Sequence, residues 1–205
     1  MKEITIAVPD GMSAEWNEDG MLQLVKDNAQ EQKRDDRPIT ERIKTFEDAC
    51  KELGRRAENG DEDAANLLAD YESNKDNILN KETLAYMKLA IITAAINEEW
   101  KPEFTEDEYR WYPYFLLWTK EELEDKTDEW KDKNQLLLWG GYANNGTNAV
   151  LGYAYSIYAF SGTIAYYGSR LAYKTEALAD YSGRQFAQIW CQYHTGKEGT
   201  PWRNS

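Results

Sequence analysis

The feature of this sequence that most constrains the fold is the absence of any charged side chain from residue 134 to residue 169. This stretch of 36 residues contains six Gly and six Tyr, in a chain of which charged residues make up 30%. Within it, residues 135–143 and 149–156 predict two strands. The turn Asn144-Asn145-Gly146 between them predicts a hairpin, because Asn and Gly tolerate positive φ. With a further strand predicted at residues 166–173, the stretch indicates a small antiparallel sheet.

The N-terminal part of the chain has the pattern of a small β-hairpin. Residues 3–8 alternate between polar and apolar side chains, and two short apolar segments, 14–16 and 21–25, flank a polar turn at residues 17–20. Alternating segments around a polar turn predict antiparallel strands. Residues 26–38 are polar and charged, which is typical of a linker.

Three helices are predicted in the middle of the chain. Thr40 is suited to begin the first helix as its N-cap, and Gly54 to end it. Its inward face is marked by apolar side chains at helical spacing: Ile43, Phe46, Cys50 and Leu53. The second helix is predicted at residues 62–71. The third, residues 83–96, is apolar nearly all round, which indicates a buried central helix.

Two capping boxes surround an aromatic segment. They are Thr105–Glu108 and Thr119–Glu122, and the second predicts an acidic helix that extends to about Lys133. Pro113, in the aromatic run between the boxes, indicates an edge strand or an irregular segment. Further along, Thr175 is predicted to cap a closing helix.

The order of these elements predicts an α+β fold. We expect an N-terminal hairpin arm and linker over residues 1–36, and a single α+β globular domain over residues 37–205. That domain would have a helical middle, a small antiparallel C-terminal sheet and a closing C-terminal helix. Residues 196–205 predict a loose tail.

The charge distribution excludes several classes of partner. The net charge is −13, and residues 1–133 hold 34 acidic and 19 basic side chains. A phosphate backbone requires a basic footprint, so no nucleic-acid partner is expected.

Residues 149–167 approach the length of a membrane span, but their Gly, Ser, Thr and Tyr make membrane insertion unfavourable. The start of the chain lacks the apolar core of a signal peptide, so the chain is predicted to be cytoplasmic when made, with a virion as the alternative location.

Residues that commonly carry chemistry are few. The only histidine, His194, is predicted to be a solvated side chain near a helix end, and a single histidine argues against a catalytic zinc site. Cys50 and Cys191 are predicted to be inert, buried or half-buried thiols. The sequence has no HExxH, EF-hand or Gly-x-Ser-x-Gly motif. We therefore expect no catalytic residue, no metal and no cofactor.

The carboxylates leave an enzyme open as an alternative. Two carboxylates beside an aromatic platform are the arrangement of glycosidases. Trp100 and Trp111 are close in sequence to six acidic residues: Glu98, Glu99, Glu103, Glu106, Asp107 and Glu108. Acidic residues at a helix start also favour the helix dipole, and a run of charges is usually solvated. We therefore rank a glycan-active enzyme below a binding function.

The neutral stretch has the composition of a recognition surface. Tyr supplies large, stiff contact area, while Ser, Gly and Asn supply adaptable hydrogen bonding. A strand alternates between two faces, so packing against helices accounts for one face. A binding surface accounts for the absence of charge on the other. The expected partner is a protein or glycan ligand on a cell surface or within a virion. The alternative is a structural or assembly protein whose copies form a homo-oligomer through the same stretch.

Two short segments resemble the end of the C-type-lectin-like fold shared by formylglycine-generating enzymes and the variable proteins of diversity-generating retroelements. They are Leu138-Trp139-Gly140-Gly141 and Gly168-Ser169-Arg170-Leu171-Ala172, where those chains carry Gly-Gly and Gly-Phe-Arg-Leu-Ala. Ser169 therefore departs from the pattern. The cysteine pair of the formylglycine enzymes has no counterpart in this region, so oxidase activity is not implied. In the retroelement proteins the intervening stretch binds the ligand, which implies a contact face at Asn144, Asn145, Asn148, Tyr153, Tyr155, Tyr158 and Tyr166. With Tyr142 added, these are the predicted ligand-binding residues.

The chain as a whole resembles small proteins borne by phages and prophages of gut bacteria. The segments that carry this resemblance are Ile39–Ala49, Tyr112–Phe115 and Gly168–Lys174. The resemblance implies a phage context and no particular chemistry. Together with the neutral stretch, it predicts a noncatalytic recognition protein. A virion is one place where such a protein would act.

Overall fold

The computed structural model describes residues 7–9, 12–17, 19–26, 35–78, 80–103, 108–133, 136–142, 148–160 and 169–201. The chain divides into two compact units, Met1–Arg37 and Pro38–Ser205.

The described part of the first unit contains a two-stranded antiparallel sheet, as predicted. Its strands are β1 (Met12–Trp16) and β2 (Leu22–Lys26). Asn17 Oδ1 accepts hydrogen bonds from the backbone N–H groups of Asp19 (3.1 Å) and Met21 (2.8 Å). Such a side-chain contact to the backbone two or more residues on stabilises a tight turn. Of the strand predicted at residues 3–8, only residues 7 and 8 are described, and they do not form a strand.

Two helices occupy the region where the first helix was predicted. They are α1 (Ile39–Arg42) and α2 (Phe46–Glu58). The prediction of Thr40 as the N-cap is wrong, because Thr45 and Asp48 form a capping box in which Thr45 Oγ1 accepts from the Asp48 N–H (3.1 Å) and Asp48 Oδ2 accepts from the Thr45 N–H (2.9 Å). Gly54 does not end α2. Burial of the neighbouring Leu53, which is 0% exposed, offsets the cost of about 1 kcal/mol for Gly inside a helix.

The other two predicted helices are confirmed. They are α3 (Glu62–Asn74) and α4 (Lys81–Ile96). Both begin at a polar cap, since Asp61 accepts a hydrogen bond from the Ala64 N–H and Asn80 accepts one from the Thr83 N–H. As predicted, α4 is the buried central helix. Its buried residues are Ala85, Leu89, Ala90, Ile91, Ile92, Thr93, Ala95 and Ile96.

Four antiparallel strands form the sheet of the second unit, in the order β3-β5-β4-β6. They are β3 (Tyr109–Thr119), β4 (Leu136–Tyr142), β5 (Asn148–Phe160) and β6 (Thr200–Pro201). Since β3 is at an edge, the edge strand predicted from Pro113 is confirmed. The tail predicted to be loose contributes β6. Gln188 holds this tail, because its Nε2 donates to the Gly199 carbonyl (2.6 Å) and its Oε1 accepts from the Gly199 N–H (3.2 Å).

The capping box at Thr119 and Glu122 is confirmed, but the acidic helix that it opens is shorter than predicted. Two helices occupy the predicted range, α5 (Lys120–Glu124) and α6 (Asp128–Lys133). Thr127 Oγ1 accepts from the Trp130 N–H (3.2 Å) and so begins the second of them. Most of the other predicted box, at residues 105–108, lies outside the described residues.

The strand predicted at residues 166–173 is wrong over its described part. Residues 169–171 form one 3₁₀ turn, η1 (Ser169–Leu171), and Tyr173 pairs through an isolated bridge with Trp111. The Asn97 side chain explains the difference, because its Nδ2 donates to the Ala172 carbonyl (2.7 Å) in place of a neighbouring strand.

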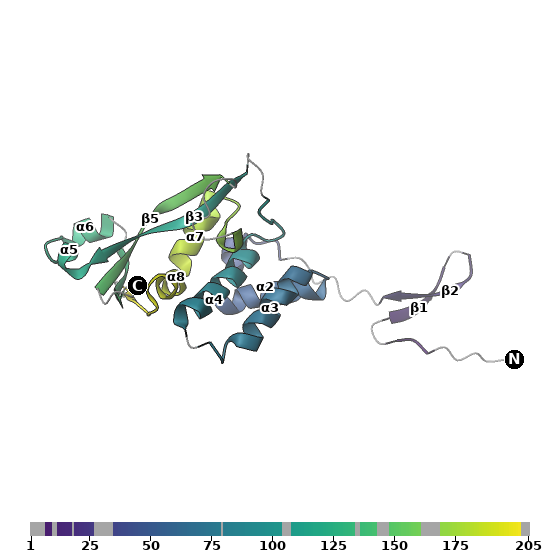
Figure 1. Cartoon of the computed structure of the whole chain (residues 1–205). Coiled ribbons are helices and arrows are strands. Elements are labelled where there is room, and N and C mark those ends of the chain that lie inside the picture. Colours follow the sequence, from purple (N-terminus) through teal and green to yellow (C-terminus); the bar gives the residue numbers. More distant parts are fainter. Residues whose placement is uncertain are drawn as a thin grey trace. The chain divides into compact units, whose positions relative to one another are not determined.

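The closing helix begins at Thr175, as predicted, and is divided at Phe186. Its two parts are α7 (Glu176–Gln185) and α8 (Ala187–Thr195). In the second unit α7 contacts β3 and β5, while α8 contacts β4 and α4. In turn, α2 and α3 contact α4, so α7 and α8 lie between the sheet and the group formed by α2, α3 and α4 (Figure 1). The fold is of the α+β class, as predicted, and the C-type-lectin-like architecture stays a prediction.

Candidate functional site

The neutral stretch contributes β4 and the central strand β5 to the sheet. β5 lies between β3 and β4, and none of its 13 residues is charged. Five of the predicted ligand-binding residues belong to these two strands: Tyr142, Asn148, Tyr153, Tyr155 and Tyr158. The other three lie outside the described residues, together with the predicted hairpin turn: Asn144, Asn145 and Tyr166. The sheet therefore collects the described candidates on adjacent strands.

A β-bulge separates the tyrosines of β5. Tyr153 is paired with Phe115 and Tyr155 with Tyr114, and the register shifts between the two pairs. Directly opposed residues share one face of a sheet. The Phe115 ring contacts Trp190 of α8, with ring centroids 5.6 Å apart. The register of β3 and β5 therefore places Tyr153 at a position on the face covered by α7 and α8, and Tyr155 at a position on the opposite face.

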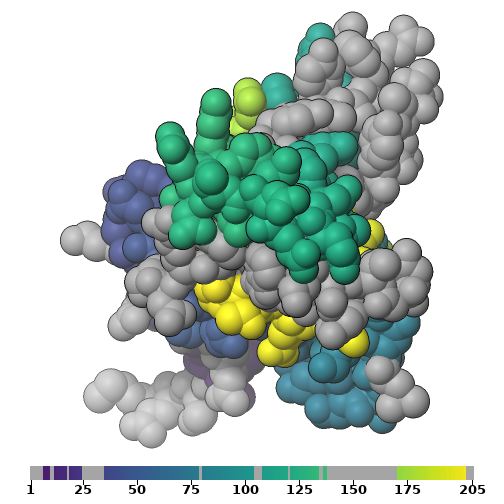
Figure 2. Space-filling model, turned by 90° about the vertical axis from the view of Figure 1, so that its left-hand side faces the viewer, coloured from purple at the N-terminus to yellow at the C-terminus, as the bar shows by residue number. Residues whose placement is uncertain are grey.

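Apolar surface is exposed beside this part of β5. Leu116 of β3, which is 38% exposed, is paired with Gly152, next to the pair of Tyr114 and Tyr155. We call these four residues the outer patch. Toward the end of β3 the sheet is contacted by α5, and Figure 2 shows α5 and α6 (green) on the face turned to the viewer, above the C-terminal segment (yellow). The register therefore places the four positions of the outer patch on the face of the sheet opposite α7 and α8, and none of the four residues is charged.

His194 packs among aromatic rings, so the prediction of a solvated side chain is wrong. Its ring stacks on Trp190 (centroids 6.0 Å apart) and contacts Phe115 (5.5 Å) and Tyr193 (5.1 Å). Burial lowers the pKa of His194 to about 4. The imidazole is therefore neutral at pH 7 and contributes to the core. Trp190 and Tyr193 are neighbours on the same helix, but the contact with Phe115, which comes from the distant strand β3, is not apparent from the local sequence.

We expect the free energy of unfolding to fall as the pH drops from about 6.5 toward 4. The folded state holds the pKa of His194 at about 4, below the value of about 6.5 expected in an unfolded chain, so the unfolded state takes up the proton first. The loss from this group should reach about 2 kcal/mol at about pH 5. Urea unfolding of the wild type and of His194→Gln at about pH 7.5 and about pH 5 measures it. Carboxylates titrate in both proteins, so the difference between the two pH dependences is the readout. An identical pH dependence in the two proteins would argue against this assignment.

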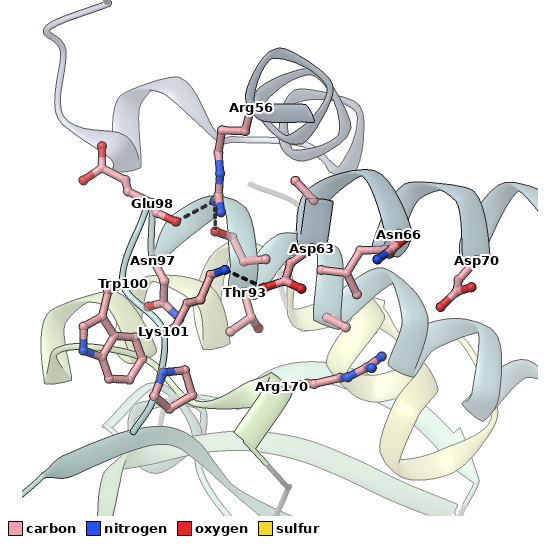
Figure 3. A pocket seen from close by; sticks show the side chains of 15 residues that line it. Arg56, Asp63, Asn66, Asp70, Thr93, Asn97, Glu98, Trp100, Lys101 and Arg170 are labelled. Atoms are coloured by element: carbon pink, nitrogen blue, oxygen red, sulfur yellow. Dashed lines mark hydrogen bonds and ion pairs between the residues drawn. The ribbon is translucent and has the colours of Figure 1, made fainter. Parts of the chain in front are cut away.

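A pocket of about 370 Å³ opens between α3, α4, the loop that follows α4, and η1 (Figure 3). Its volume is within the range of small-molecule sites, about 300–1,000 Å³. The apolar part of its lining includes Leu67, Ala90 and Trp100. The polar part includes Asp63, Asn66, Asp70, Lys101 and Arg170.

The loop after α4 is held by a buried amide and by an arginine. Asn97 Nδ2 donates to the Ala172 carbonyl (2.7 Å), and Asn97 Oδ1 accepts from the Lys174 N–H (3.0 Å). Glu98 has φ of 55°, a left-handed conformation that is uncommon for residues other than Gly. Its carbonyl accepts a hydrogen bond from Arg56 Nη1 (2.5 Å). This wall of the pocket is therefore fixed by contacts to α2 and to the segment before α7.

Most charges around the pocket are paired within the protein. The pairs are Arg56 with Asp61 (2.5 Å), Lys101 with Asp63 (2.5 Å) and Glu98 with Arg42 (2.6 Å). The hydrogen bond from Arg56 lowers the pKa of Asp61. By contrast, the side chains of Asn66, Asp70 and Arg170 make no hydrogen bond or ion pair with other described residues. These three polar groups are thus available in the pocket.

The carboxylates considered for a glycosidase do not converge in this pocket. Of the six between residues 98 and 108, four are described, and Glu98 is the one of these four that lines the pocket. Its carboxylate is paired with Arg42 (2.6 Å), while that of Glu108 is paired with Arg110 (3.3 Å). Glu106 and Asp107 lie outside the described residues. The described carboxylates therefore do not provide the acid and the base of a glycosidase.

Both cysteines are free, and their predicted burial is confirmed. Cys191 is buried and Cys50 is half-buried. Burial raises the pKa of the Cys50 thiol to about 11 and also raises that of Cys191, so neither is a reactive thiolate at pH 7. Within the described ranges, no three His, Cys, Asp or Glu side chains are grouped so that they could hold a metal ion.

The described elements define an α+β protein with an antiparallel sheet, in which β4 and β5 carry no charged residue, and with a polar pocket among its helices. No protein-family model matches the chain, and no curated protein or solved structure matches it. No helix in the described part of the chain is long and apolar enough to cross a membrane. The resemblances to C-type-lectin-like and phage-borne proteins therefore rest on sequence segments alone.

The pocket was not predicted from the sequence. A signal was present in α3, where Asp63, Asn66 and Asp70 follow one another at spacings of three and four residues. That spacing places the three on one face of a helix. Trp100 and Arg170 belong to distant segments, and no local pattern indicates that they line the same cavity.

Proposed function

We propose that this chain is a noncatalytic recognition protein that binds a protein or glycan ligand through β4, β5 and the adjoining part of β3. The observation that carries the proposal is the uncharged central strand β5 beside the exposed Leu116 of β3. Contiguous exposed apolar patches on proteins commonly mark contact sites. The Tyr, Asn, Ser and Gly residues of the neutral stretch would supply contact area and hydrogen bonds.

A phage or prophage origin, with association with a virion, belongs to the same proposal. It is supported by the sequence resemblance of residues 39–49, 112–115 and 168–174. Mass spectrometry of purified virions tests this location, and the absence of the chain from the virions would contradict it.

The bulge in β5 supplies a matched pair of variants for testing the surface. We expect Tyr155→Ala, at a register position of the outer patch, to weaken binding at least about tenfold, as truncation of an aromatic contact residue commonly does. Its free energy of unfolding should change by less than about 1 kcal/mol. Tyr153→Ala, on the face that packs against helices, should instead cost about 3–5 kcal/mol of stability. Binding is measured on a glycan array and on host cells, and stability by urea unfolding.

Two outcomes would contradict the proposal. One is wild-type binding by Tyr155→Ala. The other is the absence of binding by the wild type to both the array and the cells. Light scattering of the same samples distinguishes the alternative function, because a stable homo-oligomer that buries the neutral strands leaves no free surface for a ligand.

A further inference from the structure

Three polar side chains of the pocket face a shared space without a partner in the described part of the protein. They are Asn66 and Asp70 of α3 and Arg170 of η1. In Figure 3, Asn66 and Asp70 extend from α3, and Arg170 reaches the pocket from the opposite side. A guanidinium, a carboxylate and an amide therefore line one cavity of about 370 Å³. The absence of an Arg170–Asp70 ion pair leaves both charges available to a third group.

The backbone that carries Arg170 is anchored, although its side chain is exposed. The next three residues, Leu171, Ala172 and Tyr173, are 0% exposed. The Ala172 carbonyl is also bound by the buried Asn97 amide (2.7 Å). The guanidinium of an arginine presents a planar fork of donors, which matches the two oxygens of a carboxylate.

Another part of the pocket wall is apolar. Trp100 is half-buried and packs against Tyr112 and Ala172. It lines the end of the pocket away from Asp70 (Figure 3), and Pro102 also belongs to the lining. An aromatic ring held by packing offers a large surface to the carbon skeleton of a ligand, and its face attracts cationic groups. The pocket thus combines an anion-binding group, hydrogen-bond acceptors and a surface for carbon atoms.

We propose that this pocket binds a small carboxylate ligand that also carries hydrogen-bond donors, the chemistry shared by amino acids and acidic sugars. The carboxylate of the ligand contacts Arg170, and its ammonium or hydroxyl groups donate to Asp70 and Asn66. Its carbon skeleton lies along the apolar lining, which includes Leu67 and Ala90 and extends to Trp100. This site involves α3, α4 and η1 and is independent of recognition at the sheet.

Calorimetric titration of the full chain tests the site. The probes are L-leucine and D-glucuronate, each with an analogue that lacks the carboxylate, namely 3-methylbutylamine and D-glucose. We expect at least one of the two carboxylates to bind and its analogue to bind at least about tenfold more weakly, because a charge-assisted bidentate contact is lost. The variant Arg170→Gln should weaken the bound carboxylate to a similar degree.

A second variant distinguishes the two ligand sources. Asp70→Asn removes the counter-charge of an ammonium but keeps an acceptor for a hydroxyl. It should therefore weaken L-leucine about tenfold and D-glucuronate by less than about threefold. The matched control is Arg184→Gln, which removes an arginine that is paired with Asp180 on α7 (3.1 Å). Thermal unfolding of each variant shows whether it is folded.

Three results with the wild type and Arg170→Gln would overturn the assignment. They are the absence of binding of both carboxylates to the wild type, equal affinity for a carboxylate and its analogue, and an Arg170→Gln variant that binds as the wild type does. A loss of binding in Arg184→Gln equal to that in Arg170→Gln would also overturn it, because the effect would then follow net charge.

Discussion

Replacement of Trp190 by Ala should lower the free energy of unfolding by about 3–5 kcal/mol. Trp190 is 0% exposed. Its ring contacts Phe115 of the sheet (centroids 5.6 Å apart), and Tyr193 (6.1 Å) and His194 (6.0 Å) of its own helix. Because α8 lies between the sheet and α4, truncation would leave a cavity at the junction of these elements. Urea unfolding followed by circular dichroism measures the loss.

Trp190→Phe is the control for this prediction. The indole Nε1 donates to Ser182 Oγ (3.3 Å), and Ser182 is also hydrogen-bonded to the Tyr173 hydroxyl (2.5 Å). Phe keeps most of the ring volume and removes this donor, so we expect a cost of about 1–2 kcal/mol, well below that of Ala. If the Ala variant were as stable as the wild type, the packing described for α8 would be wrong.

Replacement of Arg56 by Met should cost about 2–4 kcal/mol. The Arg56 side chain is 10% exposed and pairs with Asp61 (2.5 Å). Its Nη1 also donates to the carbonyls of Ala94 (2.8 Å) and Glu98 (2.5 Å). Met keeps the apolar stem but leaves one carboxylate and two carbonyls without this donor. The loop that forms one wall of the pocket would lose its contact to α2.

The neighbouring residue Arg55 provides the control. Its side chain is 41% exposed and pairs with Glu52 on the same helix (2.8 Å). The Arg55 end of this pair is exposed and Glu52 is also paired with Arg42 (3.3 Å), so Arg55→Met should change the free energy of unfolding by less than about 1 kcal/mol. Urea unfolding of the two variants gives the comparison. Equal losses would show that the contacts of Arg56 to α4 do not stabilise the fold.

Elements whose determining residues lie close together in the sequence could be predicted from it. The polar turn at Asn17–Gly20 predicts the hairpin, and the apolar residues 83–96 predict the central helix. The hydroxyls of Thr119 and Thr175 predict the starts of α5 and α7, because a capping hydrogen bond joins residues only three positions apart. Where two local signals compete, as at Thr40 and Thr45, the sequence alone does not show which cap is used.

The candidate sites depend on residues that are far apart along the chain. Simple alternation along β5 would place Tyr153 and Tyr155 on the same face. The register shift between them separates the two, and this shift is a property of the pairing with β3. The pocket needs Arg170 beside α3, and the burial of His194 needs Phe115 of β3.

Local hydrogen bonds and side-chain periodicity act over one or two turns, so the composition and order of residues were enough to specify the hairpin, the central helix and two uncharged strands in an α+β chain. The tertiary structure alone decided three features: the strand faces that meet the helices, the charges that stay without a partner, and the rings that enclose the histidine. Those outcomes are set by desolvation and packing between distant segments, and no short window of residues contains that information.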